Sequence, residues 1–292
     1  MNPNPFTTRR EILKAGGALA AALSLGPIRA SGAEPSNAPS QDPWRGLKVG
    51  MASYSFRKLP LDACIKGIQR VALHWVSIKD FHLPMNSTAE QRKEVAGKFR
   101  EAGITPISCG VVTLKNNEQS TRNAFEYARD IGVPTMVCSP DPDALPLCES
   151  LVKEFNIKLA IHNHGPEAKD FKSPLDAMRA IEKLDARIGV CIDVGHTARA
   201  GVDPASAIRT CKARLYDCHF KDINNPKGRS AGSSEVEVGR GILDVRGMLQ
   251  ALLEVGFQGH VGFEHEKDPN DPIPGVAESV GYTKGVLSGI AR

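Results

Sequence analysis

The chain has 292 residues, with 37 lysines and arginines against 33 aspartates and glutamates, and a formal net charge of +4. Most of the excess lies in residues 1–33, without which 33 basic and 32 acidic residues remain. A nearly neutral domain without a basic run is a poor binder of nucleic acid, so no nucleic-acid partner is expected.

Residues 1–33 have the order of an export signal. The paired arginines Arg9 and Arg10 precede an apolar, alanine-rich run at 15–28 and a cleavage site of small residues. The pair is typical of a twin-arginine signal, although an ordinary amphipathic helix is the alternative. The apolar run is shorter than the roughly 20 residues that span a bilayer, so no stable membrane span is expected. We expect export by the twin-arginine machinery to a periplasmic or other extracytoplasmic location, with residues 34–46 as a linker.

Residues 47–292 alternate between short apolar runs and amphipathic stretches, which is the pattern of a parallel sheet with crossover helices. Strands are predicted at 47–56, 75–81, 104–112, 134–139, 158–162, 188–193, 215–220 and 260–264. Helices are predicted at 61–73, 88–102, 118–131, 145–155, 174–184, 204–214, 245–255 and 276–290. Eight strands, each followed by a helix, predict an α/β fold, a (β/α)8 TIM barrel in a single domain of about 250 residues.

Polar side chains follow the last four predicted strands. They are His162 and His164, Asp193 and His196, His219 and Lys221, and Glu264. The carboxyl ends of barrel strands meet at one rim, where the active sites of such barrels lie. A mixed set of imidazoles and carboxylates suits a divalent metal ion such as Mn²⁺, Co²⁺, Fe²⁺ or Zn²⁺. Alternatively, these side chains only form hydrogen bonds with the backbone of the loops at the rim. That explanation would have to apply to four neighbouring strands at once.

Four short segments of the sequence match motifs of a known family of barrels. They are Asp193-Val194-Gly195-His196, His219-Phe220-Lys221-Asp222, the VGRGILD stretch at 238–244, and Phe263-Glu264-His265-Glu266. On these segments, residues 47–290 resemble the xylose isomerase-like barrels, also called the sugar phosphate isomerase/epimerase superfamily. The resemblance implies a metal ion held by His162, Asp193, His219 and Glu264. It also implies that His196, and with it Lys221, contacts substrate.

Histidine at position 162 is a departure from this family, whose epimerases place a metal-bound glutamate there, opposite the one on the last strand. Imidazole can bind the metal or act as a base near neutral pH, so Glu264 and His162 are the predicted catalytic residues. Whether His162 or its neighbour His164 is the ligand stays open at this point, and His164 is also a predicted substrate contact. With one carboxylate missing, elimination by a single base becomes an alternative to epimerisation.

The early strands add one candidate. Lys79, at the end of the second predicted strand, is expected to bind substrate, with a structural ion pair to Asp80 as the alternative.

The resulting hypothesis is a metal-dependent sugar isomerase or epimerase that removes a proton next to a carbonyl. Export, and the lack of a glycine-rich phosphate cradle, favour a non-phosphorylated sugar. The alternatives are a lyase of keto-sugars or 3-keto-glycosides and an exported, non-catalytic sugar-binding barrel. An apurinic-site endonuclease is disfavoured, because it would need a basic groove and a location inside the cell. Barrels of this kind often pair, so a homodimer is one state that the chain could adopt.

Overall fold

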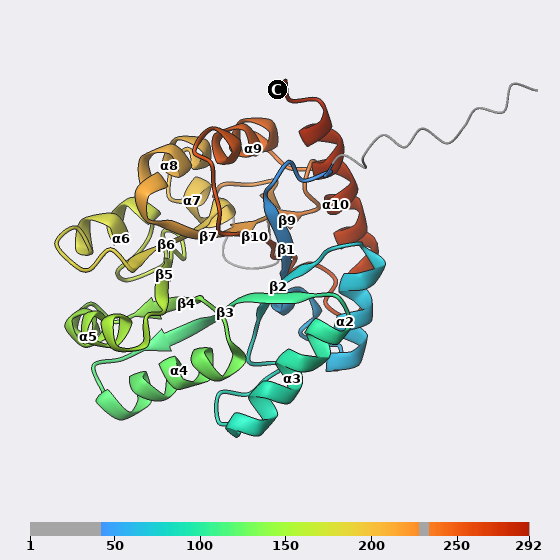
Figure 1. The fold of residues 1–292 in the computed structure, drawn as a ribbon. Coiled ribbons are helices and arrows are strands. Elements are labelled where there is room, and N and C mark those ends of the chain that lie inside the picture. The colour runs from blue at the N-terminus through green and yellow to red at the C-terminus, as the bar shows by residue number, and fades with distance from the viewer. Residues whose placement is uncertain (1–41, 228–233, 292) are drawn as a thin grey trace, which may run out of the picture. The chain divides into compact units, whose positions relative to one another are not determined.

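The structure, a computed structural model, describes residues 42–227 and 234–291, which form a closed barrel of eight parallel strands inside a ring of helices (Figure 1). The barrel strands are β1 (Lys48–Ala52), β2 (Trp75–Ile78), β3 (Thr105–Leu114), β4 (Thr135–Pro140), β5 (Lys158–His162), β6 (Ile188–Asp193), β7 (Leu215–Phe220) and β10 (His260–Phe263). The predicted single-domain (β/α)8 barrel is confirmed.

The helices of the ring follow the strands in chain order. They are α2 (Leu61–Arg70), α3 (Ala89–Glu101), α4 (Glu118–Ile131), α5 (Leu145–Phe155), α6 (Pro174–Ala180), α8 (Pro204–Cys211), α9 (Val245–Glu254) and α10 (Ile273–Ser288). The predicted bounds of α4 and α5 match the structure, and the others differ by a few residues at their ends.

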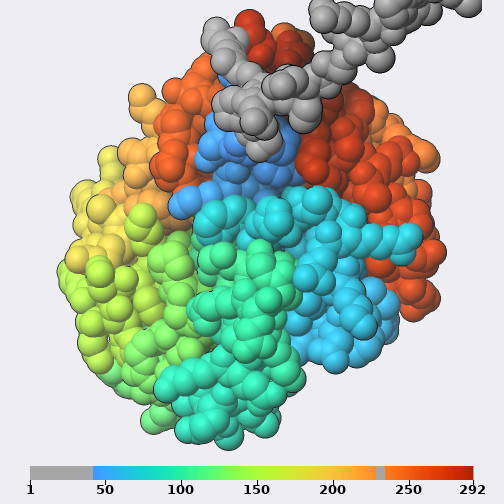
Figure 2. Space-filling view, turned by 45° about the vertical axis from the view of Figure 1, so that its right-hand side comes forward, coloured from blue at the N-terminus to red at the C-terminus, as the bar shows by residue number. Residues whose placement is uncertain are grey.

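The barrel closes between the first and last strands. In the parallel pair of β1 and β10, Lys48 is the partner of His260 and Met51 the partner of Phe263. Figure 2 shows the blue and cyan residues of the first strand–helix unit lying against the red residues of α10. Every strand therefore has two neighbours, and the sheet has no free edge.

Helix α4 shows why the sequence was informative about the ring. The side chain of Asn117 accepts a hydrogen bond from the backbone N–H of Ser120 and caps the first turn. Ala124, Phe125 and Ala128 are buried on the helix face that meets the barrel. Gly132 ends the helix in the left-handed conformation, φ 77°, which glycine adopts without steric cost.

The first predicted strand, 47–56, was too long. Strand β1 stops at Ala52, and Ser53–Phe56 form a 3₁₀ turn, η1. The hydroxyl of Ser53 accepts a hydrogen bond from the backbone N–H of Lys79, and that of Ser55 accepts one from His265. These side chains satisfy backbone donors of other strand ends, which a strand pattern does not reveal.

Three short elements were not predicted. Helix α7 (Val194–Arg199) follows β6 directly, and strands β8 (Asp222–Ile223) and β9 (Glu235–Val236) form an antiparallel pair beyond β7. All three lie at the carboxyl end of the barrel, where the polar strand ends meet.

The predicted signal, residues 1–33, and residues 34–41 of the predicted linker lie outside the described residues. Within the described part of the chain, no helix is both long and apolar enough to cross a membrane.

Candidate metal centre

Four side chains from neighbouring strands converge at the carboxyl end of the barrel. His162, Asp193 and His219 are the last or next-to-last residues of β5, β6 and β7, and Glu264 directly follows β10. Each offers one ligand atom, and the four atoms lie within 4.8 Å of one another. All four residues are buried. The barrel thus brings together the whole set that the family resemblance implied.

The distances within this group suit a single ion. His162 Nε2 lies 2.9 Å from His219 Nδ1, and His219 Nδ1 lies 3.1 Å from Glu264 Oε2. His162 Nε2 lies 3.5 Å from Asp193 Oδ2, an oxygen with no aligned hydrogen-bond donor among the described residues. Nitrogen and oxygen ligands that each sit about 2.0–2.2 Å from one ion are spaced in this way. The donor set therefore fits a divalent transition metal.

Asp193 has two roles that its two oxygens divide between them. Oδ1 accepts a hydrogen bond of 2.7 Å from the backbone N–H of His196 and caps helix α7. The backbone N–H of Asp193 donates to Asn163 Oδ1 at 3.0 Å, which fixes the end of β6 against the end of β5. Because Oδ1 is engaged by the helix, Oδ2 remains for the centre. Asn163, which directly follows His162, is a positioning residue that was not predicted from the sequence.

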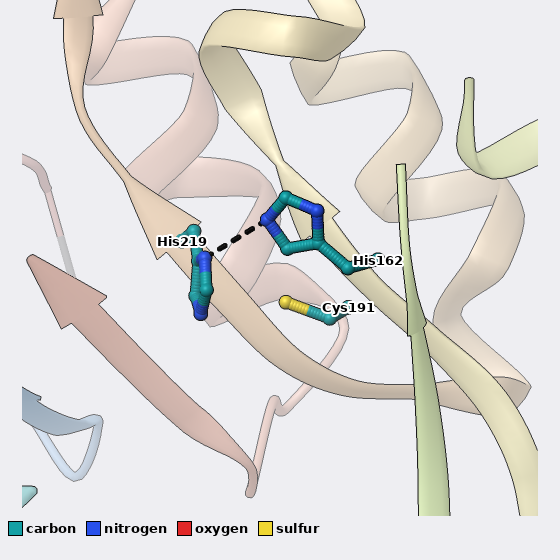
Figure 3. Close-up of side chains that lie close together, drawn as sticks. All are labelled: His162, Cys191 and His219. Atoms are coloured by element: carbon teal, nitrogen blue, oxygen red, sulfur yellow. Dashed lines mark hydrogen bonds between the residues drawn. The ribbon is translucent and has the colours of Figure 1, made fainter. Parts of the chain in front are cut away.

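A thiol lies under the centre (Figure 3). His162, Cys191 and His219 form a second group whose possible ligand atoms lie within 4.8 Å of one another. Cys191 is two residues before Asp193 on β6, so it is on the same side of the strand and one step deeper in the barrel. Burial raises the pKa of this thiol well above its ordinary value, which disfavours the thiolate. The group with two carboxylates is thus the better cation site.

The ionisation of the ligands also favours a cation. Burial lowers the pKa of His162 to about 4, so its imidazole is neutral and has a free lone pair at neutral pH. Burial opposes charge on His219 as well, yet Glu264 raises the pKa of its imidazole above the ordinary value. The environment therefore stabilises positive charge between His219 and Glu264.

Lys221 supplies positive charge to both carboxylates. Its Nζ lies 2.8 Å from Glu264 Oε2 and 3.0 Å from Asp193 Oδ2. Burial alone would raise the pKa of Glu264, but His219 and then Lys221 hold it well below its ordinary value. Burial would likewise raise the pKa of Asp193, and Lys221 is the main group that holds it low. Lys221 was predicted to contact substrate, but its ammonium instead contacts the carboxylates of Asp193 and Glu264.

Two further glutamates, Glu266 and Glu235, reach the same ammonium. Glu266 Oε1 lies 2.7 Å from Lys221 Nζ, and Glu235 Oε2 lies 3.9 Å from it. Glu235 comes from β9, and its Oε1 accepts a hydrogen bond of 2.6 Å from the backbone N–H of Glu266. Burial raises the pKa of Glu235 well above its ordinary value despite the nearby lysine. No motif marks Glu235, because only the pairing of β8 with β9 brings it to the centre.

Two more histidines stand next to His162. The ring of His164 lies 4.4 Å from that of His162 between centroids, and the ring of His196 lies 6.0 Å from it. Arg199 Nη1 lies 3.0 Å from His196 Nδ1. A guanidinium only donates hydrogen bonds, so Nδ1 accepts, and Nε2 of a neutral His196 carries the proton. Arg199, which also pairs with Glu167, was not predicted.

Lys79 is placed differently from the other predicted residues. Its ammonium donates a hydrogen bond of 2.8 Å to the carbonyl oxygen of Val111 and lies 3.6 Å from Asp80. It lines a cavity of about 440 Å³ beside the ends of β2 and β3. Among the described residues, we find no hydrogen bond or ion pair between Lys79 and the four donor side chains.

Comparison with known proteins assigns the family. Residues 67–285, three quarters of the chain, match the xylose isomerase-like TIM barrel. The chain belongs to this family. The chain is 26% identical over 141 residues to the rhizopine catabolism protein MocC of Rhizobium meliloti. This match covers 44% of the chain and 43% of MocC. The chain is 21% identical over 134 residues to an inosose dehydratase of Lacticaseibacillus casei, covering 42% and 45%. The matches thus span less than half the length of these relatives.

A solved structure supports the fold. The IolI protein with a bound zinc atom superposes with a TM-score of 0.70 at 15% identity, over 83% of this chain and 99% of that one. At this identity the likeness shows the barrel fold alone.

Proposed function

We propose that this xylose isomerase-like barrel is a divalent-metal-dependent enzyme that isomerises or epimerises a non-phosphorylated sugar by removing a proton next to its carbonyl. The observation that carries the proposal is the convergence of His162, Asp193, His219 and Glu264 at the carboxyl end of the barrel. A divalent ion held there would polarise the carbonyl oxygen and so acidify the neighbouring C–H.

Glu264 is the proposed base. Its pKa is held well below the ordinary value, so it is a carboxylate at neutral pH and can accept a proton. It directly follows β10 and is 8% exposed, whereas Asp193 is fully buried and engaged by helix α7. Of the two carboxylates in the centre, Glu264 is therefore the one that a substrate can approach.

His196 and His164 are the proposed substrate contacts. Both are partly exposed beside the buried His162. With Nδ1 accepting from Arg199, His196 presents an Nε2–H that can donate to a substrate hydroxyl or carbonyl oxygen. Burial lowers the pKa of His164 to about 4, so this ring is neutral and can accept or donate one hydrogen bond. His162, the other predicted catalytic residue, is proposed here to act as a metal ligand.

Elimination is the second candidate, and the uneven distribution of groups favours it. Glu264, Glu266 and Glu235 come from β9 and the end of β10, whereas the imidazoles of His162, His164 and His196 come from the ends of β5 and β6. A carboxylate that removes the proton next to the carbonyl and can return it to the departing oxygen, with an imidazole N–H that donates a hydrogen bond to that oxygen, suits the loss of water or an alcohol from a keto-sugar. One relative bears the name inosose dehydratase.

The substrate class is argued from charge and location. Arg199, an arginine beside the centre, is already paired with Glu167 and His196, and Lys221 is already paired with carboxylates. These contacts leave neither cation directed at a phosphate. We further propose that the protein is exported by its twin-arginine signal, which would separate it from cytosolic sugar phosphates.

Proton exchange tests the proposal. The purified protein with Mn²⁺ or Co²⁺ is incubated in D₂O with ketoses, aldoses or 3-keto-glucosides, and products are followed by NMR. We expect deuterium next to the carbonyl, and no exchange with Glu264→Gln, whose side chain has nearly the same shape. Loss of water or an aglycone would select elimination. Absence of exchange with every substrate, despite bound metal, would leave the sugar-binding barrel as the better account.

A further inference from the structure

The ammonium of Lys221 occupies the carboxylate side of the metal centre. It lies within 3.0 Å of oxygens of Asp193, Glu264 and Glu266, and 3.9 Å from Glu235. The Lys221 side chain is only 4% exposed, so water contributes little to its solvation. Two of these oxygens, Asp193 Oδ2 and Glu264 Oε2, are also those that face His162 and His219. A carboxylate oxygen has two lone pairs and can bridge two cations.

The charges of this cluster nearly balance when one divalent ion is added. Asp193, Glu264 and Glu266 are the three carboxylates in close contact with the ammonium. One ammonium and one divalent ion together carry the same amount of positive charge as these three groups carry of negative charge. Buried charges are costly unless they are paired, so such a balance favours one metal ion and disfavours a second.

The side chains around the ammonium include three glutamates, whose oxygens are of the kind that bind a divalent metal ion. Glu235, Glu264 and Glu266 converge from β9 and the end of β10, and carboxylate oxygens suit Mn²⁺. We propose that Lys221 is the second cation of the centre, held where a second metal ion would otherwise bind, and that it limits the centre to one divalent ion. This inference rests on the metal centre of the proposed function.

Metal stoichiometry tests the inference without any assay of activity. The chelator-stripped protein is dialysed against excess Mn²⁺, and bound manganese per chain is measured by plasma mass spectrometry, with electron paramagnetic resonance to detect coupled pairs of ions. We expect one ion in the unmodified protein and two in Lys221→Met. The double variant Lys221→Met/Glu266→Gln, which removes one charge of each sign, should return to one ion.

A matched control separates this effect from the loss of any lysine. Lys267 Nζ pairs with Glu237 Oε1 at 2.9 Å and, among the described residues, has no ion pair with the four donor side chains, so Lys267→Met should leave one ion bound. If Lys221→Met does not fold, Lys221→Gln replaces it. One ion in both the unmodified protein and the Lys221 variant, or two in the unmodified protein, would overturn the inference but not the proposed function. No bound ion in the unmodified protein would overturn both.

Discussion

At the scale of single residues, Asp193 shows how one side chain can link the fold to the chemistry. Its Oδ1 caps helix α7, and its Oδ2 faces the candidate centre. Asparagine caps a helix about as well as aspartate but carries no charge. Alanine provides neither the cap nor the charge. The two roles can therefore be separated by substitution.

We expect Asp193→Asn to lose most of its metal affinity but to keep the helix cap, so its metal-free form should be more stable than that of Asp193→Ala. Asp193→Ala should lose the affinity and, in addition, about 1 kcal/mol of metal-free stability, because the cap is lost as well. Chelator-competition titration gives the affinity, and denaturant unfolding gives the stability. Equal metal affinity in the unmodified chain and Asp193→Asn would show that this carboxylate is not a ligand.

The four residues of the centre could be predicted because each lies at the end of a strand. His162, Asp193, His219 and Glu264 are marked in the sequence because polar side chains follow buried, apolar strands. Glu235 and Arg199 have no such mark. Glu235 reaches Lys221 only through tertiary pairing, and Arg199 reaches His196 from within a helix of six residues that the pattern did not reveal.

At the scale of elements, Asp222 explains the VGRGILD stretch that carried part of the family resemblance. Its carboxylate accepts hydrogen bonds from the backbone N–H groups of Gly239, Gly241, Leu243 and Ile223. A Cβ at position 241 would lie 2.0 Å from Asp222 Oδ1, so glycine is required there. One buried side chain thus holds the loop that follows β9.

Asp222→Asn should destabilise the fold by about 2–3 kcal/mol, because the amide cannot accept all of these bonds and loses the strength of a charged acceptor. Denaturant unfolding measures the change. Asp203→Asn is the control, since Asp203 caps α8 through one exposed hydrogen bond from Ser206, which asparagine also accepts. A similar, small loss in both variants would mean that Asp222 does not organise the loop.

The elements that could be predicted are those with a regular apolar period. Strands β5, β6 and β7 have the predicted bounds, since each is a short buried run between polar or glycine-containing segments. The strands of two residues, β8 and β9, have no period that a sequence could show. The turn at Ser53–Phe56 likewise depends on backbone donors from Lys79 and His265, which are distant in the sequence.

At the scale of the whole molecule, the bound ion should stabilise the barrel, because the four ligands come from strands far apart in the chain. At a free metal concentration 100 times the Kd, an ion that binds only the folded chain adds about 2.7 kcal/mol to the free energy of unfolding. For a domain of this size, we expect chelation to lower the Tm by about 5–10 °C. Differential scanning calorimetry with and without chelator measures it, and an unchanged Tm would contradict a metal held between strands.

Export is the other property of the whole chain. Replacing Arg9 and Arg10 with lysines keeps the charge but removes the arginine pair of the predicted twin-arginine signal. We expect the variant to accumulate unprocessed in the cytoplasm of a bacterial host, as judged by fractionation and the mass of its amino terminus. Unimpaired export would show that the twin-arginine route is not used.

The ligand set itself is the central claim, and X-ray absorption spectroscopy of the zinc-loaded protein tests it most directly. We predict a shell of nitrogen and oxygen only, at about 2.0–2.2 Å, with the outer-shell scattering of two imidazoles from His162 and His219. A sulfur at about 2.3 Å would instead place the ion on Cys191, deeper in the barrel, and would contradict the account.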